Sequence, residues 1–173
     1  MSVGALYRGA GLALQSEAAA AAGIDFASWK VFFADERCVA LDHDDSNYKA
    51  CAEALFGPLP FSKDNIFPID PALPAAECAA AYQQVLMSHL LADGVGALPE
   101  GVTLDLICLG MGPDGHTASL FPNHVLSTHD GALDLEAGAG SWVAAIEDSP
   151  KPPAERVTMT RHATLPARPG SSA

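Results

Sequence analysis

A single histidine at the end of a glycine-rich loop is the part of this sequence best suited to chemistry. His116 follows Gly110, Gly112 and Gly115. A histidine side chain exchanges a proton near neutral pH, so His116 is a candidate general base. Glycines let backbone N–H groups approach an anion, and a helix that starts after the histidine would also favour negative charge. The alternative interpretation is a glycine turn beside a solvated histidine that caps the next helix.

Asp114 precedes this histidine by two residues and can orient the loop or accept a hydrogen bond from a sugar hydroxyl. The sequence Pro-Asp-Gly is also a common turn, so a simple turn residue is an equal alternative. The backbone N–H groups near Gly112 and Gly115 are candidate donors to an oxyanion or a phosphate. The loop thus predicts an anion site with a base at its edge.

Three cationic side chains are candidate phosphate ligands. Arg37 stands in Asp35-Glu36-Arg37, directly after a predicted strand, and its planar guanidinium can give a phosphate two hydrogen bonds. The alternative is a surface salt bridge with Glu36. Lys151 and Arg156 bracket two prolines, whose fixed φ angles set where both cations point. The alternative for this pair is a solvated proline loop.

The elements that must position these residues alternate between strands and helices. The near-continuous apolar run Leu104–Leu109 predicts a buried parallel strand that ends in the glycine loop, and such strand ends form the ligand sites of open α/β sheets. Further strands are predicted at 29–33, 65–67 and 141–146, helices at 47–56 (N-cap Ser46) and 74–91, and irregular chain at 95–102 and 124–140. The fold class is therefore α/β, with a mostly parallel sheet flanked by helices.

The bulk properties fit one globular domain. The chain has 173 residues, which suffice for a sizeable core. Its net charge of −12 at pH 7 argues against nucleic acid and anionic membranes as partners. No apolar run approaches the roughly 18 residues of a transmembrane helix. The four cysteines form no CxxC pair and no metal-ligand pattern, which predicts a reducing compartment without structural disulfides or a bound metal.

Three dispersed segments resemble the 6-phosphogluconolactonases, which belong to the glucosamine/galactosamine-6-phosphate isomerase superfamily. The segments are Gly112-Pro-Asp-Gly-His-Thr-Ala-Ser-Leu-Phe-Pro122, Phe33-Ala-Asp-Glu-Arg-Cys-Val39 followed by Asp45-Ser-Asn-Tyr48, and Asp148-Ser-Pro-Lys-Pro-Pro-Ala-Glu-Arg-Val-Thr-Met-Thr160. Their order and spacing also fit the family. The resemblance covers roughly residues 2–160 and predicts one domain over 1–160.

The resemblance implies a Rossmann-like fold and hydrolysis of 6-phospho-D-glucono-1,5-lactone to 6-phospho-D-gluconate, a step of the oxidative pentose phosphate pathway. It implies His116 as the general base. We also expect Asp114 to be catalytic, and because hydrolysis of a lactone needs only an activated water and a stabilised oxyanion, we expect no metal or cofactor. The substrate-binding residues that we expect are Arg37, Asp35, Ser46, Asn47, Gly112, Gly115, Lys151, Arg156 and Ser2. For Ser46 and Asn47, a purely helix-capping role is an even alternative. We expect a small sugar-phosphate partner, a monomer and a cytoplasmic location, with an organellar form left open.

Two other functions compete with this one. Glucosamine-6-phosphate deaminase-type isomerases carry a similar Gly-x-x-x-Asp-Gly-His loop, although the residues after His116 resemble the lactonase version. A non-catalytic, shortened domain is the other alternative. The resemblance implies a strand and a Gly-Gly-Ser loop at the start, and we expect this sequence to begin inside that loop, with Met1 at the place of a glycine. The likeness stops at Thr160, so we expect 161–173 to be a loose tail and the sheet to be incomplete.

Overall fold

A parallel sheet is the first of two small sheets that the described chain forms in this computed structural model, which describes residues 5–6, 23–90, 104–127 and 141–164. Its strand order is β1-β2-β4, with β1 at Ala5–Leu6, β2 at Val31–Phe33 and β4 at Ile66–Phe67. β2 is central, and its aromatic and β-branched residues are buried on both faces, as a parallel strand requires.

The second sheet is antiparallel and brings two of the motifs together. Its order is β3-β6-β5, with β3 at Asp35–Arg37, β6 at Arg156–Met159 and β5 at Val143–Ile146. In this register Arg37 lies opposite Arg156, and Asp35 lies opposite Thr158. Residues that are far apart in the sequence therefore meet at one edge of the sheet.

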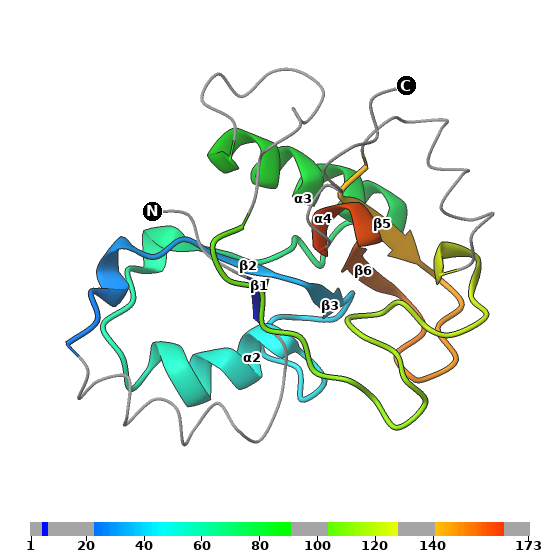
Figure 1. Cartoon of the computed structure of the whole chain (residues 1–173), viewed down its shortest axis with the longest axis horizontal. Helices are drawn as coiled ribbons and strands as arrows, with labels where there is room; N and C mark the ends of the chain where they lie inside the picture. Colours follow the sequence, from blue (N-terminus) through cyan, green and yellow to red (C-terminus); the bar gives the residue numbers. More distant parts are fainter. Residues whose placement is uncertain (1–4, 7–22, 91–103, 128–140, 165–173) are drawn as a thin grey trace, which may run out of the picture.

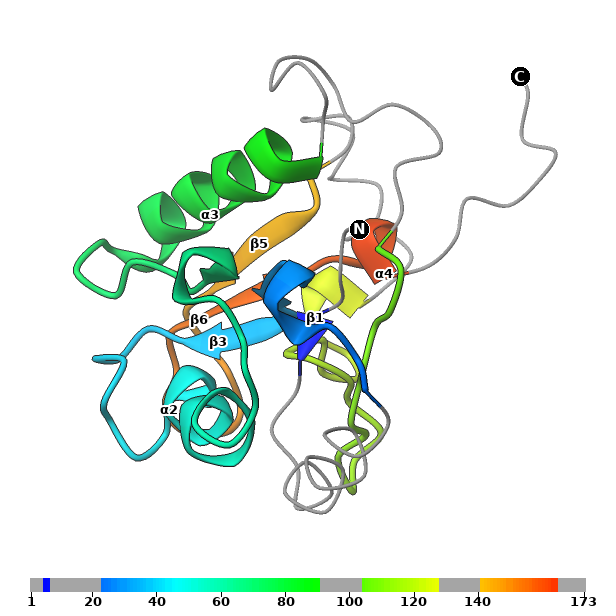
Figure 2. The ribbon, with the colours of Figure 1, turned by 90° about the vertical axis from the view of Figure 1, so that its left-hand side faces the viewer.

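Helices cover the sheets from two sides. α3 (Ala75–Leu90) packs on β5 and β6, and α2 (Asn47–Cys51), which continues as the π-helical turn η2 (Ala52–Phe56), packs on β3 (Figures 1 and 2). The short helix α4 (Arg161–Thr164) contacts β6. Three 3₁₀ turns complete the described elements: η1 (Phe26–Ser28), η3 (Lys63–Asn65) and η4 (Val125–Ser127).

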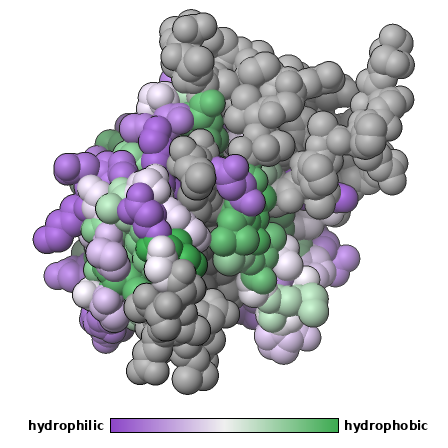
Figure 3. Space-filling view, turned by 60° about the vertical axis from the view of Figure 1, so that its left-hand side comes forward, coloured by the Kyte–Doolittle hydropathy of each residue, from purple (hydrophilic) through white to green (hydrophobic). Residues whose placement is uncertain are grey.

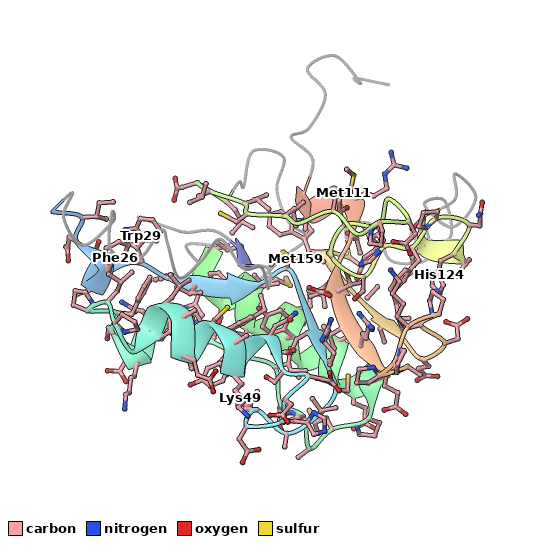
Figure 4. All side chains as sticks on the ribbon, turned by 90° about the horizontal axis from the view of Figure 1, so that it is seen from below. Phe26, Trp29, Lys49, Met111, His124 and Met159 are labelled. Atoms are coloured by element: carbon pink, nitrogen blue, oxygen red, sulfur yellow. The ribbon has the colours of Figure 1, made fainter. Side chains whose placement is uncertain are left out.

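The main core lies between α3 and the two sheets. Phe32, Tyr82, Leu86, Val143 and Met159 are among its buried side chains. The hydroxyl of Tyr82 accepts a hydrogen bond from the backbone N–H of Phe33 at 2.5 Å, which fastens α3 to β2. A separate aromatic cluster around Phe26 and Trp29 packs on the turn that follows α2, and Figure 4 shows both residues at the end of the molecule away from His124.

Most of the predicted elements are confirmed. The strands predicted at 29–33, 65–67 and 141–146 and the helices predicted at 47–56 and 74–91 each contain the corresponding element, and the α/β class with a parallel sheet is confirmed. The antiparallel sheet was not expected. It forms because Asp35-Glu36-Arg37 is itself a strand, although three consecutive charged residues do not have the composition of a buried strand.

The prediction of a strand at Leu104–Leu109 is wrong. The segment forms no strand, and Leu106 and Leu109 are 44% and 39% exposed, while Leu104 reaches the core. A strand requires a neighbour that pairs with its backbone N–H and C=O groups. No described strand pairs with 104–109. Apolar character alone did not distinguish a strand from an unpaired apolar segment.

The tail predicted from residue 161 is also partly wrong. Its first four residues form α4, and Ala163 is buried against the core. Ser2, the segments 95–102 and 128–140, and the tail from 165 onward lie outside the described residues. Among the described helices, none is long and apolar enough to cross a membrane. Figure 3 shows one face on which hydrophobic surface gathers near the centre and most of the hydrophilic surface lies to its left.

Candidate active site

The glycine loop folds back on itself through two backbone hydrogen bonds. The N–H of Gly112 donates to the carbonyl of His116 at 2.8 Å, and the N–H of Gly115 donates to the carbonyl of Gly112 at 2.9 Å. Gly115 has a φ of +87°, a conformation that a residue with a side chain adopts at a cost. The loop is thus a closed turn that presents Asp114 and His116 on adjacent positions of one rim.

This turn corrects one expectation. We expected backbone N–H groups around Gly112 and Gly115 to donate to an oxyanion or a phosphate, but the N–H groups of these two glycines themselves donate inside the loop. Gly112 has a steric role instead. A Cβ atom built on it would overlap the imidazole of His116 and would lie 2.7 Å from Oδ1 of Asp114. The glycine therefore makes room for the histidine–aspartate pair.

His116 is buried, and its Nδ1 edge is fully engaged. Nδ1 lies 2.5 Å from Oδ1 of Asp114 and 3.3 Å from Nζ of Lys151, and that lysine pairs with the other Asp114 oxygen at 2.9 Å. Lys151 and then His116 hold the pKa of Asp114 well below its usual range, so the carboxylate is ionised. Because a carboxylate accepts and does not donate, neutral His116 carries its proton on Nδ1 and its lone pair on Nε2.

Phe121 packs against the imidazole of His116. Its buried ring lies 4.6 Å from the imidazole of His116, centroid to centroid, with an interplanar angle of 32°. Nζ of Lys151 and the guanidinium of Arg156 also lie over the same ring, at 5.8 Å and 5.5 Å. Cations above an aromatic face are attracted by its quadrupole, so Phe121 holds the base and both cations in one place.

Arg156 organises the loop that carries Lys151. Its guanidinium is buried and donates to the carbonyl oxygens of Pro153, Lys151 and Pro152 at 3.0, 2.9 and 3.2 Å. The side chain of Lys151 is 39% exposed. Of the two predicted phosphate ligands on this loop, Lys151 thus presents its charge to the outside, while Arg156 is committed to the backbone beneath it.

A buried serine, Ser119, links the segment of Asp35 to the segment of Arg156, and it was not among the residues predicted from the sequence. Oγ of Ser119 donates to Oδ2 of Asp35 at 2.7 Å and accepts from Nη1 of Arg156 at 3.3 Å. Burial raises the pKa of Asp35, and the Ser119 hydrogen bond and the charges of Arg37, Arg156 and His116 act against that rise. The only signal for Ser119 was its place three residues after His116, inside the motif that resembles the family.

Glu36 fixes the positions of Ser46 and Asn47 through hydrogen bonds. The buried Glu36 carboxylate accepts hydrogen bonds from the backbone N–H of Asn47 and Tyr48 at 2.7 Å each, and from Ser46 Oγ at 3.1 Å. Ser46 Oγ also accepts from the N–H of Lys49 at 3.2 Å, which confirms it as the N-cap of α2.

The amide of Asn47 reaches the other acid of the motif. Its Nδ2 donates to Oδ1 of Asp35 at 3.1 Å and to the Asp35 carbonyl at 2.8 Å. Ser46 and Asn47 are both fully buried, so the contacts that the structure gives them are to protein. Arg37 is half-buried, and its Nη1 donates to the carbonyl of Asp45 at 2.7 Å, while its Nε has no partner among the described residues.

A second histidine–aspartate pair lies nearby but is built differently. Nε2 of His124 lies 3.0 Å from Oδ1 of Asp148, and its Nδ1 accepts from the N–H of Leu126 at 3.2 Å. Both ring nitrogens of His124 are therefore occupied, whereas Nε2 of His116 has no hydrogen bond to a described residue. Figure 4 shows His124 near the loop side of the antiparallel sheet. Of these two histidines, His116 is therefore the one whose Nε2 is not engaged by a described residue.

The described residues contain no cluster of histidine, cysteine, aspartate and glutamate suited to a metal ion. The groups that the described site offers are the imidazole of His116, the two carboxylates of Asp114 and Asp35, and the three cations Arg37, Lys151 and Arg156. This set can take a proton from water beside an anionic ligand.

Comparisons with known proteins show which family this chain resembles. The sequence matches the family model described as glucosamine-6-phosphate isomerases/6-phosphogluconolactonase over residues 4–169. It is 41% identical over 140 residues, 79% of this chain, to the protein named 6-phosphogluconolactonase 3, chloroplastic, from Arabidopsis thaliana. The crystal structure of 6-phosphogluconolactonase from Thermotoga maritima matches 92% of this chain with a TM-score of 0.68 and 30% identity. A monomeric glucosamine-6-phosphate deaminase matches with a TM-score of 0.61 at 14% identity, which shows a shared fold.

The chain spans about half the length of the curated relatives it matches. It covers 40% of the Arabidopsis protein, 51% of the rat protein named 6-phosphogluconolactonase and 62% of the Thermotoga chain.

Proposed function

This chain belongs to the family of glucosamine-6-phosphate isomerases and 6-phosphogluconolactonases, and we propose that it hydrolyses 6-phospho-D-glucono-1,5-lactone to 6-phospho-D-gluconate. The observation that carries the proposal is the orientation of His116. Asp114 holds its Nδ1 edge at 2.5 Å, which leaves the Nε2 lone pair for a water molecule. The relatives whose names give this reaction support the choice of substrate.

The proposed reaction needs one base that later serves as an acid. Nε2 of His116 takes a proton from water while the water oxygen bonds to the lactone carbonyl carbon. The carbonyl electrons move to its oxygen and form a tetrahedral oxyanion. When this intermediate collapses, the bond to the ring oxygen breaks, and the proton on Nε2 passes to that oxygen. Asp114 stabilises the imidazolium between the two transfers.

The phosphate is assigned to Lys151 and Arg37. Lys151 is partly exposed beside His116, and Arg37 has a guanidinium N–H that no described protein group accepts. Charge-assisted hydrogen bonds from such groups to a phosphate are the strong ones. Four other predicted ligands position the site without contacting the phosphate themselves. Their polar atoms hold the Lys151 loop and β3 in place: Arg156, Asp35, Ser46 and Asn47. Ser2 keeps its predicted role in phosphate binding as a proposal.

The partner and the compartment are part of the same proposal. A phosphorylated sugar is the small-molecule partner that a histidine base flanked by cations suits. We propose a monomer in a reducing compartment. The cytoplasm is the first choice, and the relatives named chloroplastic leave an organelle open.

The test is an assay of the purified full chain. Glucose-6-phosphate dehydrogenase generates the lactone in place, acid release is followed, and spontaneous hydrolysis is subtracted. We expect turnover above the spontaneous rate, and a higher KM for unphosphorylated gluconolactone than for the phosphorylated lactone. Arg37→Ala and Lys151→Ala should raise KM for the phosphorylated lactone about 10- to 100-fold, as expected for one charged hydrogen bond.

A matched lysine provides the control. Lys49 pairs with Asp44 at 2.6 Å on α2, so Lys49→Ala should leave KM unchanged. If Arg37→Ala and Lys151→Ala raise KM for both lactones alike, the phosphate site lies elsewhere. Ammonia release from glucosamine 6-phosphate would favour the deaminase alternative. Lactone hydrolysis at the spontaneous rate by a cooperatively folded chain would favour a non-catalytic domain.

A further inference from the structure

A buried carboxylate that the proposed reaction does not use lies between β3 and the start of α2. Glu36 is 1% exposed. Its Oε1 accepts hydrogen bonds from the backbone N–H groups of Arg37 and Asn47, each at 2.7 Å. Its Oε2 accepts from the N–H of Tyr48 at 2.7 Å and from Oγ of Ser46 at 3.1 Å. One side chain thus joins the end of β3 to the start of α2, which packs against that strand (Figure 2).

The four partners of Glu36 determine the charge of its carboxyl group. Each of them donates a hydrogen bond, and a carboxyl group that kept its proton would direct a further donor against them. Burial raises the pKa of Glu36, and the four hydrogen bonds act against that rise. The geometry therefore favours the ionised form, because only a carboxylate can accept all four bonds.

The segment between the two ends that Glu36 joins carries the contact that orients Arg37. Nη1 of Arg37 donates to the carbonyl of Asp45 at 2.7 Å, while its Nε has no partner among the described residues. Glu36 holds the N–H of Arg37 on one side and the residues that directly follow Asp45 on the other. Both ends of the contact between Arg37 and Asp45 therefore depend on one carboxylate.

We propose that Glu36 is a positioning residue for phosphate binding, because it holds the guanidinium of Arg37 in place. The inference rests on the assignment of the phosphate to Arg37 in the proposed function. Glu36 does not touch the ligand itself, since it is buried and both of its oxygens are occupied by protein donors. A change at position 36 should therefore affect binding only through Arg37.

A double-mutant cycle on the full chain tests this dependence. Glu36→Gln keeps the shape of the side chain but replaces one acceptor oxygen with an NH₂ group that faces two donors. By titration calorimetry, we expect it to raise the dissociation constant of 6-phosphogluconate about tenfold, in the range found for coupled members of one hydrogen-bond network. In the Arg37→Ala background, the same change should have no further effect on the dissociation constant.

Tyr82→Phe is the matched control for a loss of stability. The hydroxyl of Tyr82 is also buried and accepts from the N–H of Phe33 at 2.5 Å, but it fastens α3 to β2 and not α2 to β3. Urea unfolding should show a loss of stability in this variant, with an unchanged dissociation constant. If Glu36→Gln does not unfold cooperatively, Ser46→Ala replaces it in the cycle, because it removes one of the four donors. It should show a smaller rise that also vanishes in the Arg37→Ala background.

Two results would overturn the positioning role alone. A lower stability with an unchanged dissociation constant would leave Glu36 with a structural role only, and an equal rise in both backgrounds would mean that it does not act through Arg37. Failure of the proposed function gives a different result. If the wild type does not bind 6-phosphogluconate, or if Arg37→Ala binds it as tightly as the wild type does, the phosphate assignment and the positioning role are both wrong.

Discussion

Gly112 leaves the space that the imidazole of His116 occupies. A Cβ atom at position 112 would overlap that ring, and the N–H of Gly112 donates to the carbonyl of His116 at 2.8 Å. The loop thus closes on its own histidine, and the absence of a side chain at one position fixes the place of the base at another.

Gly112→Ala should therefore impair catalysis more than folding. A methyl group would push the imidazole away from Asp114, and a displacement of about 1 Å can lower turnover about 10²-fold. Steady-state kinetics should show this fall in kcat with KM nearly unchanged. Gly23→Ala is the control, because Gly23 has a φ of +67° and open space around it. That variant should lose about 1–2 kcal/mol of stability and keep its kcat. Equal kcat in the two variants would refute the steric role.

Asp114→Asn should lower kcat about 10²-fold while binding of the product, 6-phosphogluconate, persists. An amide can present its NH₂ group to Nδ1, which would move the proton of His116 to Nε2 and remove the lone pair from the water side. Asp148→Asn is the matched control, since Asp148 pairs with His124 and not with the base. The idea fails if the two variants lose the same activity.

The same aspartate should leave a signature in the pH dependence of stability. Lys151 and His116 hold the pKa of Asp114 below its ordinary value of 3.8, so the folded chain binds fewer protons there than the unfolded chain. Its contribution is present above that value and is lost as the pH falls through the lowered pKa. Urea unfolding should show the advantage of the wild type over Asp114→Asn shrinking below about pH 4. An advantage that grows on acidification would contradict the assignment.

Ser119→Ala should weaken substrate binding through residues that Ser119 positions. The change leaves the buried Asp35 carboxylate without its 2.7 Å donor. It also removes the Ser119 oxygen that accepts from Nη1 of Arg156, the residue that holds the Lys151 loop. We expect a loss of about 1–3 kcal/mol in stability and a raised KM for the phosphorylated lactone. Ser141→Ala removes a serine that bonds Gln83 away from the site, so it should lower stability without changing KM. An unchanged KM in Ser119→Ala would make Ser119 merely structural.

The sequence predicted elements well where local signals act. Ser46 could be recognised as an N-cap because capping involves residues within one helical turn. The failure at 104–109 has the opposite origin, since a strand depends on a partner that the local sequence does not name. The strand character of Asp35-Glu36-Arg37 was hidden for the same reason. Its two carboxylates are matched by Ser119, 84 positions from Asp35, and by Asn47, 11 positions from Glu36, and neither lies within the strand.

The candidate site could also be predicted only where the residues themselves carried the signal, and not where the path of the backbone decides. His116, Asp114 and Lys151 could be proposed from residue types and from the family resemblance, and the structure places them within 3.3 Å of one another. The commitment of Arg156 to its own loop could not be predicted, because it depends on the path of the backbone. The internal use of the glycine N–H groups depends on the same path.

The central claim is that His116 is the general base, and a comparison of two histidines tests it most directly. His116→Ala and His124→Ala each remove an imidazole from a histidine–aspartate pair. The two histidines differ at Nε2: that of His124 contacts Asp148, whereas that of His116 has no partner among the described residues. We predict that His116→Ala lowers kcat for lactone hydrolysis about 10²–10⁴-fold with little change in KM, while His124→Ala stays within about threefold of the parent. A kcat for His116→Ala within about threefold of the parent, in a chain that still binds 6-phosphogluconate, would contradict the account.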